Sequence, residues 1–173
     1  ENPIDQEGTY PLPEAQMDRF MLKLIIDYPD REEELKILEA NANLSVKHEA
    51  NPVVDAETLF RARKMVDGVY LDDKLKGYLV DVVLATRQPD RYGASELSAF
   101  IRFGASPRAT ISLALASKAV AFMNGRSFVT PQDIKDVGLD VLRHRVIVSY
   151  EAEAEDVSSD DIIQKIFETV PVP

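Results

Sequence analysis

From residue 30 onward the chain is a succession of helix-start and helix-stop signals, and this feature constrains its fold most. Residues that cap helix N-termini stand before apolar residues at helical spacing, at Asp30, Asp55, Asp72, Ser106 and Thr130. After Ser106 and Thr130 a proline occupies the first helical position, where its missing N–H costs nothing. Gly68 and Gly125 follow the ends of two predicted helices. With a last helix expected from Ser159, the pattern predicts a mainly α fold.

The strongest strand candidate is the short apolar run at residues 21–27, which is bounded by Pro29. Its length and its pair of β-branched residues are typical of a buried strand. A lone strand cannot satisfy its own backbone hydrogen bonds. We therefore expect that its partner strands lie elsewhere, or that the chain is part of a longer protein.

The helix predicted at residues 107–124 is apolar nearly all round, which is typical of a helix buried at the centre of a bundle. We interpret it as bundle core rather than as the wall of a ligand cavity. Residues 88–105 are expected to be irregular, and residues 151–156 to form an exposed acidic spacer. The pairs Asp72-Asp73 and Asp160-Asp161 open helices, so capping explains them better than metal binding.

The composition excludes several classes of function. With 20 basic and 30 acidic residues, the formal charge of −10 argues against nucleic acid as a partner. The chain has no cysteine for a disulfide or a thiolate metal site, and two histidines are too few for most histidine metal sites. No apolar run is long enough for a membrane span, and the opening residues lack the basic start of a targeting segment. A cytoplasmic location is therefore expected. The glycine spacing excludes a P-loop.

Three blocks of sequence resemble the MoxR family of AAA+ ATPases. Residues 2–20 (NPIDQEGTYPLPEAQMDRF) resemble the segment that follows the fourth core strand of that family. Residues 104–109 (GASPRA) resemble its sensor-2 motif, and residues 141–146 (VLRHRV) resemble its C-terminal signature. The blocks occur in the order and at the spacing of the family, so the resemblance covers essentially the whole chain.

The resemblance implies an architecture. In the family, a five-stranded parallel α/β core carries the Walker A and Walker B motifs, and a helical lid follows it. Neither Walker motif is in this chain. Residues 1–29 are therefore expected to be the C-terminal end of the AAA+ core, with residues 21–27 as its fifth strand. Residues 30–173 are expected to be the lid, which makes the fold a helical lid bundle preceded by a strand and loop from an α/β P-loop core.

The resemblance also assigns three site residues. Asn2 would be the sensor-1 residue, Arg19 an arginine finger that reaches the neighbouring subunit's nucleotide, and Arg108 the sensor-2 residue that contacts the nucleotide. The alternatives are an Asn-Pro turn, an arginine paired with Asp18 or Glu14, and a solvated arginine beside a helix cap. Arg108 stands in the first turn of its helix, where the dipole does not favour a cation. Such a local conflict is typical of a residue kept for a ligand.

The basic cluster at residues 143–145 lies at a predicted helix C-terminus, where positive charge is favourable. This is a sufficient explanation for it, and contact with a partner or a phosphate is the alternative. Near the first block, Glu7, Glu14 and Asp18 are interpreted as caps or solvated carboxylates, with the orientation of Arg19 as the alternative. No metal ligand is predicted.

The implied function is that of a ring-forming, hexameric ATPase that uses ATP and Mg²⁺ for chaperone-like remodelling or maturation of protein clients. A hinge at residues 28–30 would couple nucleotide state to lid motion. The chain alone, lacking the P-loop lysine and the Mg²⁺ ligands, is predicted to be inactive. The alternative is a non-enzymatic, all-α interaction module whose acidic surface suits a basic partner. The charge disfavours a DNA-binding lid.

Overall fold

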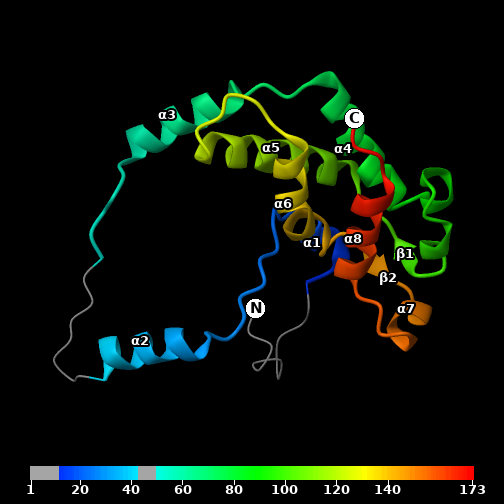
Figure 1. The fold of residues 1–173 in the computed structure, drawn as a ribbon, viewed down its shortest axis with the longest axis horizontal. Helices are drawn as coiled ribbons and strands as arrows, with labels where there is room; N and C mark the ends of the chain where they lie inside the picture. The colour runs from blue at the N-terminus through cyan, green and yellow to red at the C-terminus, as the bar shows by residue number, and fades with distance from the viewer. Residues whose placement is uncertain (1–11, 43–49) are drawn as a thin grey trace.

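The structure is a computed structural model, and it describes residues 12–42 and 50–173. This part of the chain is mainly helical, as the sequence predicts (Figure 1). The helices are α1 (Glu14–Met17), α2 (Arg31–Asn41), α3 (Ala56–Asp67), α4 (Asp73–Ala85), α5 (Pro107–Met123), α6 (Pro131–Leu142), α7 (Tyr150–Ala154) and α8 (Ser159–Thr169). Two 3-10 helices (Pro89–Tyr92 and Ser95–Leu97) and two short strands, β1 (Ile101–Phe103) and β2 (Ile147–Val148), complete it.

The predicted caps are confirmed. The side chains of five residues accept hydrogen bonds from backbone N–H groups in the first turns of α2 to α6: Asp30, Asp55, Asp72, Ser106 and Thr130. In α2 and α6 an acidic residue at the third helical position returns the bond, which makes a capping box. At the start of α8 the cap is Ser158, and Asp161 completes a third box with it. Capping is thus confirmed for Asp72 and, as the box partner, for Asp161, whereas Asp73 pairs with Lys76 and Asp160 accepts hydrogen bonds from Arg143.

The core lies among α4, α5, α6 and α8. Helix α5 packs against α4 and α6, and α6 also packs against α8. Their contact faces carry fully buried aliphatic residues, including Leu79, Leu113, Ile134 and Ile163. Gly138 permits the close approach of α6 and α8, because a Cβ there would lie 2.3 Å from the ring of Phe167.

Helix α5 is buried on one face only, and this corrects the expectation that it is buried nearly all round. Leu113, Ala116 and Ala121 face the core. Ile111 and Met123, however, are 61% and 73% exposed. The difference arises because α4 and α6 cover one side of α5 and leave the other uncovered, so an apolar sequence alone did not determine which residues are buried.

Residues 21–27 do not form a strand in the structure. A strand exists through hydrogen bonds to a neighbouring strand, and the Lys23 N–H instead donates to the carbonyl of Asp140 in α6, at 2.8 Å. Ile25 and Ile26 are exposed. The strand expected here is therefore absent from the described ranges, although the run is extended and apolar as the sequence indicates.

Two other expectations about irregular segments need correction. The stretch 88–105 contains both 3-10 helices and β1, which pairs antiparallel with β2 in the register Ile101 to Val148. The acidic segment 151–156 is not only a spacer, because α7 occupies most of it and buries Ala152. The sequence did not reveal β1 and β2 because each depends on pairing with a strand that is distant in sequence.

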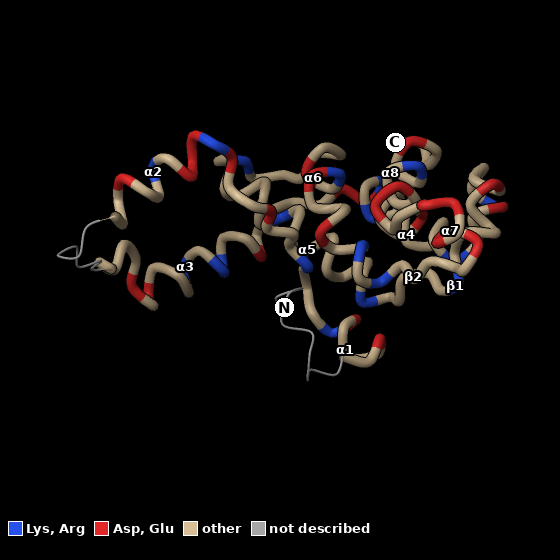
Figure 2. Tube along the Cα trace, turned by 90° about the horizontal axis from the view of Figure 1, so that it is seen from below, with Lys and Arg blue, Asp and Glu red and all other residues tan. Residues whose placement is uncertain are grey.

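Helix α2 stands apart from the bundle in two perpendicular views (Figures 1 and 2), and α3 leads from it back towards α5. Neither α2 nor α3 has a buried residue. Figure 2 also shows acidic and basic residues spread over most elements. Within the described ranges, every helix is too short or too polar to cross a membrane.

Candidate functional site

Asp18, just after α1, is the centre of the cluster in which the predicted site residue Arg108 takes part. The Asp18 carboxylate accepts hydrogen bonds from the Ser106 hydroxyl at 2.8 and 2.9 Å. It also accepts from Arg108 Nη1 at 3.0 Å and from Arg145 Nε at 3.3 Å. One carboxylate thus joins the start of the chain to the cap of α5 and to the end of α6. We call Asp18, Ser106, Arg108 and Arg145 the Asp18 cluster.

The electrostatics of the Asp18 cluster keep its carboxylate ionised. Burial raises the pKa of Asp18, but the hydrogen bonds from Ser106 and Arg108 and the charge of Arg145 outweigh burial, so that the pKa lies below its ordinary value of 3.8. Two arginines share this carboxylate, which leaves the cluster with one surplus positive charge. The cluster is therefore locally positive in a chain with a formal charge of −10.

The loop before α5 places Ser106 and Arg108 by packing against the end of α4. The Thr86 hydroxyl accepts a hydrogen bond from the Ala105 N–H at 2.9 Å. Gly104 lies against the same turn, because a Cβ there would be 2.3 Å from the Thr86 carbonyl oxygen. The glycine of the GASPRA block is therefore required for the close approach of the two chain segments, and the position of the α5 N-terminus follows from it.

Arg145 is the buried anchor of the Asp18 cluster. Its side chain is 1% exposed. The guanidinium donates to three backbone carbonyls of the adjoining segment, Asp18 at 3.2 Å, Phe20 at 2.6 Å and Met21 at 3.2 Å. It also donates to the Val141 carbonyl in α6 and to the Ser112 hydroxyl in α5. Burial lowers the pKa of Arg145 and Asp18 opposes this effect, but arginine stays charged at neutral pH.

His144 also binds this segment, at the Phe20 carbonyl that Arg145 contacts. Its Nε2 lies 3.0 Å from the Phe20 carbonyl oxygen, and because that oxygen only accepts, Nε2 must carry the proton. Nδ1 is buried and has no hydrogen-bond partner among the described residues. Burial lowers the pKa of His144, and the charges of Arg145 and Lys23 act in the same direction, so the neutral form is favoured.

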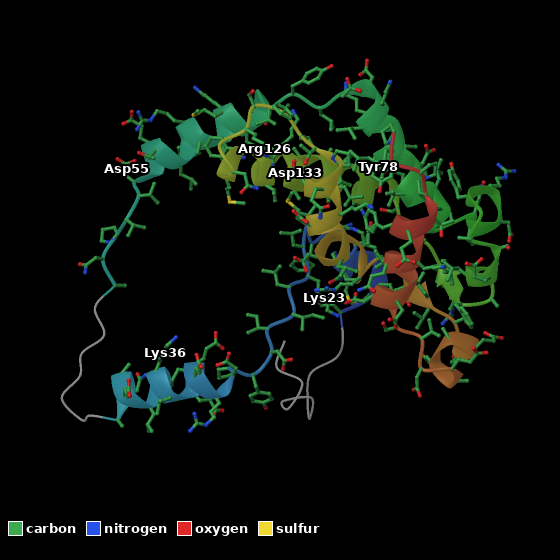
Figure 3. The ribbon with its side chains drawn as sticks, in the orientation of Figure 1. Lys23, Lys36, Asp55, Tyr78, Arg126 and Asp133 are labelled. Atoms are coloured by element: carbon green, nitrogen blue, oxygen red, sulfur yellow. The ribbon has the colours of Figure 1, made fainter. Side chains whose placement is uncertain are left out.

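Arg143 also binds the segment at residues 18–23. It forms two 3.1 Å bonds to the Asp160 carboxylate of α8, one of 2.8 Å to Asp140 and one of 3.2 Å to the Lys23 carbonyl. Lys23, labelled in Figure 3, lies on the segment that runs from α1 towards α2. The three consecutive residues 143–145 therefore fix residues 18–23 to the bundle. We call residues 143–145 the RHR clasp.

The three predicted site residues have different outcomes. Asn2 lies outside the described residues. The Arg19 side chain is exposed and, in the described part of the chain, takes part in no ion pair, so it does not pair with Asp18 or Glu14 there. Arg108 is 56% exposed and bound to Asp18 rather than free in solvent. The structure thus brings Arg108 to Asp18, the residue next to Arg19 in the sequence.

Sequence reasoning missed the parts played by Asp18 and Arg145. Asp18 was interpreted as a solvated or capping carboxylate, because nothing local predicts a partner 90 residues away. The RHR clasp was explained by the helix C-terminus, and only its match to a family signature indicated more. No local signal identifies Arg145 either, because its partner carboxylate lies 127 residues away in the sequence.

Two surface pockets lie away from the Asp18 cluster. One of about 590 Å³ lies between the α3–α4 connection and α5, lined mainly by apolar residues with Lys76 and Lys118. Another of about 390 Å³ is lined by polar residues around Arg87, Arg91 and Arg102. Neither includes Asp18 or Arg108. In residues 12–42 and 50–173 no group of three or more acidic or histidine side chains could hold a metal ion.

Comparisons with known proteins place the chain in a family. The AAA lid domain family matches residues 94–166, and the ATPase family associated with various cellular activities (AAA) matches residues 1–22. Chaperone MoxR1 of Mycobacterium tuberculosis is 38% identical over 173 residues, which are all of this chain and 45% of that protein. Protein MoxR of Paracoccus denitrificans is 30% identical over 188 residues, covering 99% of this chain and 54% of that protein.

A solved structure gives the same result in three dimensions. The crystal structure of a "putative ATPase" from Cytophaga hutchinsonii matches with a TM-score of 0.94 and 42% identity, over all of this chain and 52% of that one. The chain therefore spans about half the length of the relatives that it matches. It belongs to the MoxR family of AAA ATPases, within which it corresponds to the end of the AAA core and to the AAA lid domain.

Proposed function

We propose that this chain is the part of a MoxR-type ATPase that senses the nucleotide and carries the lid, residues 1–29 as the end of the core and residues 30–173 as the lid. The observation that carries the proposal is the Asp18 cluster. It presents a half-exposed arginine and one surplus positive charge in an otherwise acidic chain. Such a point suits the phosphates of ATP, and membership of an AAA family indicates a nucleotide as the ligand.

The roles of the site residues follow from their chemistry. Arg108 contacts the phosphates of the subunit's own nucleotide and stabilises negative charge there. Arg19 is the arginine finger that reaches the nucleotide of a neighbouring subunit. Asn2 is the sensor-1 residue, whose amide orients the attacking water. The Walker residues, which this chain does not contain, hold ATP and Mg²⁺, and the metal neutralises phosphate charge when bound.

A second feature supports the division into core end and lid. Residues 20–28 expose a run of large apolar side chains: Phe20, Met21, Leu22, Leu24, Ile25, Ile26 and Tyr28. An exposed patch of this kind marks an interaction surface. The remainder of the ATPase core would cover it, and residues 21–27 would there pair as the fifth strand. We further propose a hexameric ring in the cytoplasm that remodels or matures protein clients, on the strength of the family and of the relative named a chaperone.

The test is phosphate release from ATP by the intact protein that carries this chain together with an ATPase core. Arg108→Ala is expected to lower kcat about 10²- to 10³-fold, as for other donors that stabilise developing charge. Arg61→Ala is the matched control, because Arg61 is an exposed arginine on α3 that binds only its helical neighbour Thr58 in the described structure. It should leave turnover unchanged.

The purified 173-residue chain provides the other arm of the test. It is expected to release no phosphate, because it has no P-loop lysine. Phosphate release by this chain that Arg108→Ala abolishes would contradict the proposal, since nucleotide chemistry would then need no separate core. Equal turnover of the intact protein with and without Arg108 would contradict the sensor-2 role.

A further inference from the structure

Asp18 lies where its carboxylate can orient the Arg108 side chain. Of the donor groups on the Arg108 guanidinium, Nη1 binds Asp18 Oδ2 at 3.0 Å, and the side chain is otherwise 56% exposed. An arginine has five N–H donors in a rigid fork, so one contact with a carboxylate leaves several for a phosphate. A flexible side chain that is already held at one end loses less rotamer freedom when a ligand binds.

The position of the carboxylate also resolves the conflict between Arg108 and its helix. A cation in the first turn of α5 is unfavourable beside the positive end of the helix dipole. Asp18 binds both the cap, Ser106, and Arg108, and so places a negative charge at this helix end. The low pKa of Asp18 keeps that charge present at neutral pH. The arginine is thus tolerated at the α5 N-terminus because Asp18 accompanies it.

Asp18 is itself held firmly. Its side chain is 17% exposed, and Arg145 binds both its carboxylate and its backbone carbonyl. Arg145 in turn is buried and fixed to Ser112 of α5. A carboxylate anchored in this way can restrain the side chain that binds it to one orientation, whereas a mobile, solvated carboxylate cannot.

We propose that Asp18 is a positioning residue for Arg108, anchored by Arg145, which sets the guanidinium in the orientation that meets the nucleotide phosphates. The proposal rests on the sensor-2 role given to Arg108 above. Because Asp18 acts through Arg108, its removal should matter only while Arg108 is present. A residue that merely stabilises the fold would lower activity by the same factor whether or not Arg108 is there.

The experiment is a double-mutant cycle on kcat/KM for ATP in the intact protein. Asp18→Asn is expected to lower kcat/KM about 10- to 100-fold, the range for a misplaced catalytic group, and Arg108→Ala by more. In the Arg108→Ala background, Asp18→Asn should add less than about twofold, because the two residues act as one unit. Asp73→Asn is the matched control, since Asp73 is an exposed aspartate that pairs with Lys76 on its own helix α4, and its loss should leave kcat/KM unchanged.

Asp18→Glu covers the case in which Asp18→Asn fails to fold. It keeps the charge that Arg145 needs but moves the carboxylate oxygens by one methylene, so the protein should fold and kcat/KM should still fall, by about threefold or more. Two results would overturn the proposal for Asp18 while leaving the sensor-2 role of Arg108 standing. One is a double variant whose decrease in kcat/KM is the product of the decreases in the two single variants. The other is full activity of both Asp18→Glu and Asp18→Asn. Unchanged turnover on Arg108→Ala would overturn the sensor-2 role and this proposal together.

Discussion

The bundle of α4, α5, α6 and α8 and the segment at residues 20–42 contain similar apolar residues in opposite surroundings. Ile134 in α6 is fully buried, whereas Ile26 is 91% exposed. The same side chain therefore contributes to stability in one region and not in the other, because only the bundle supplies a packing partner among the described residues. The difference teaches that an apolar sequence does not by itself bury a side chain, and that the RHR clasp ties the first part of the run at 20–28 to the bundle.

The largest expected effect comes from shortening these two isoleucines in turn. Ile134→Ala in the 173-residue chain should lower the free energy of unfolding by about 2–5 kcal/mol, because it removes buried methylenes and leaves a cavity. Ile26→Ala should change it by less than about 0.5 kcal/mol, as is usual for an exposed position. Urea unfolding at constant m-value measures both.

The same two variants can also be compared in the intact protein. If the ATPase core covers residues 20–28, Ile26→Ala should become destabilising there while the cost of Ile134→Ala stays similar. Equal costs for the two changes in the 173-residue chain would show that Ile26 packs against something in that chain, and the contrast between the two regions would be wrong.

A smaller effect compares two capping boxes. The Thr130–Asp133 box starts α6 inside the bundle, and the Asp30–Glu33 box starts α2, which has no buried residue. Thr130→Ala should lower the free energy of unfolding by about 1–2 kcal/mol. Asp30→Ala should weaken α2 by a similar amount, yet barely move the unfolding midpoint, because α2 unfolds locally without disturbing the bundle.

Two measurements separate these cases. The urea midpoint reports the bundle, and amide hydrogen exchange in α2 reports the local helix. Asp30→Ala should accelerate exchange in α2 only. A shift of the midpoint by Asp30→Ala as large as that by Thr130→Ala would mean that α2 folds cooperatively with the bundle.

The sequence predicted what depends on nearby residues. The caps at Asp55, Ser106 and Thr130 and the helices that they start are local features, and all were confirmed. The mainly helical fold and the family followed from the same helix signals and from the three sequence blocks. These features could be predicted because each depends on residues within about one helical turn or on a recognisable motif.

The remainder depends on residues that are distant in sequence. The bonds from Arg108 and Arg145 to Asp18 span 90 and 127 residues, and no local pattern indicates them. The exposed face of α5, with Ile111 and Met123, depends on which neighbours cover that helix. Residues 21–27 form no strand among the described residues for the same reason, since a strand needs a partner strand and pairing is not a property of the run itself.

The smallest expected effect tests the RHR clasp through pH. His144 donates from Nε2 to the Phe20 carbonyl, and its buried Nδ1 would have to carry the second proton beside the charge of Arg145. The pKa of His144 in the folded chain is therefore below its ordinary value of 6.5, so the unfolded chain takes up this proton at a higher pH than the folded chain does. The stability associated with neutral His144 is present above pH 6.5 and is lost as the pH falls below it.

The comparison of urea midpoints at pH 7 and pH 5.5 isolates this contribution when His144→Gln is measured beside the unaltered chain. Glutamine can still donate to the Phe20 carbonyl but does not titrate, so the variant should lose less stability on acidification. Other titrating groups are common to both chains and cancel in the difference. After correction for the slower intrinsic exchange at acid pH, the amide protection factors at residues 18–23 should fall at pH 5.5 in the unaltered chain before those in α6 do. An identical pH dependence of the two chains would show that protonation of His144 does not act on the segment that the RHR clasp holds.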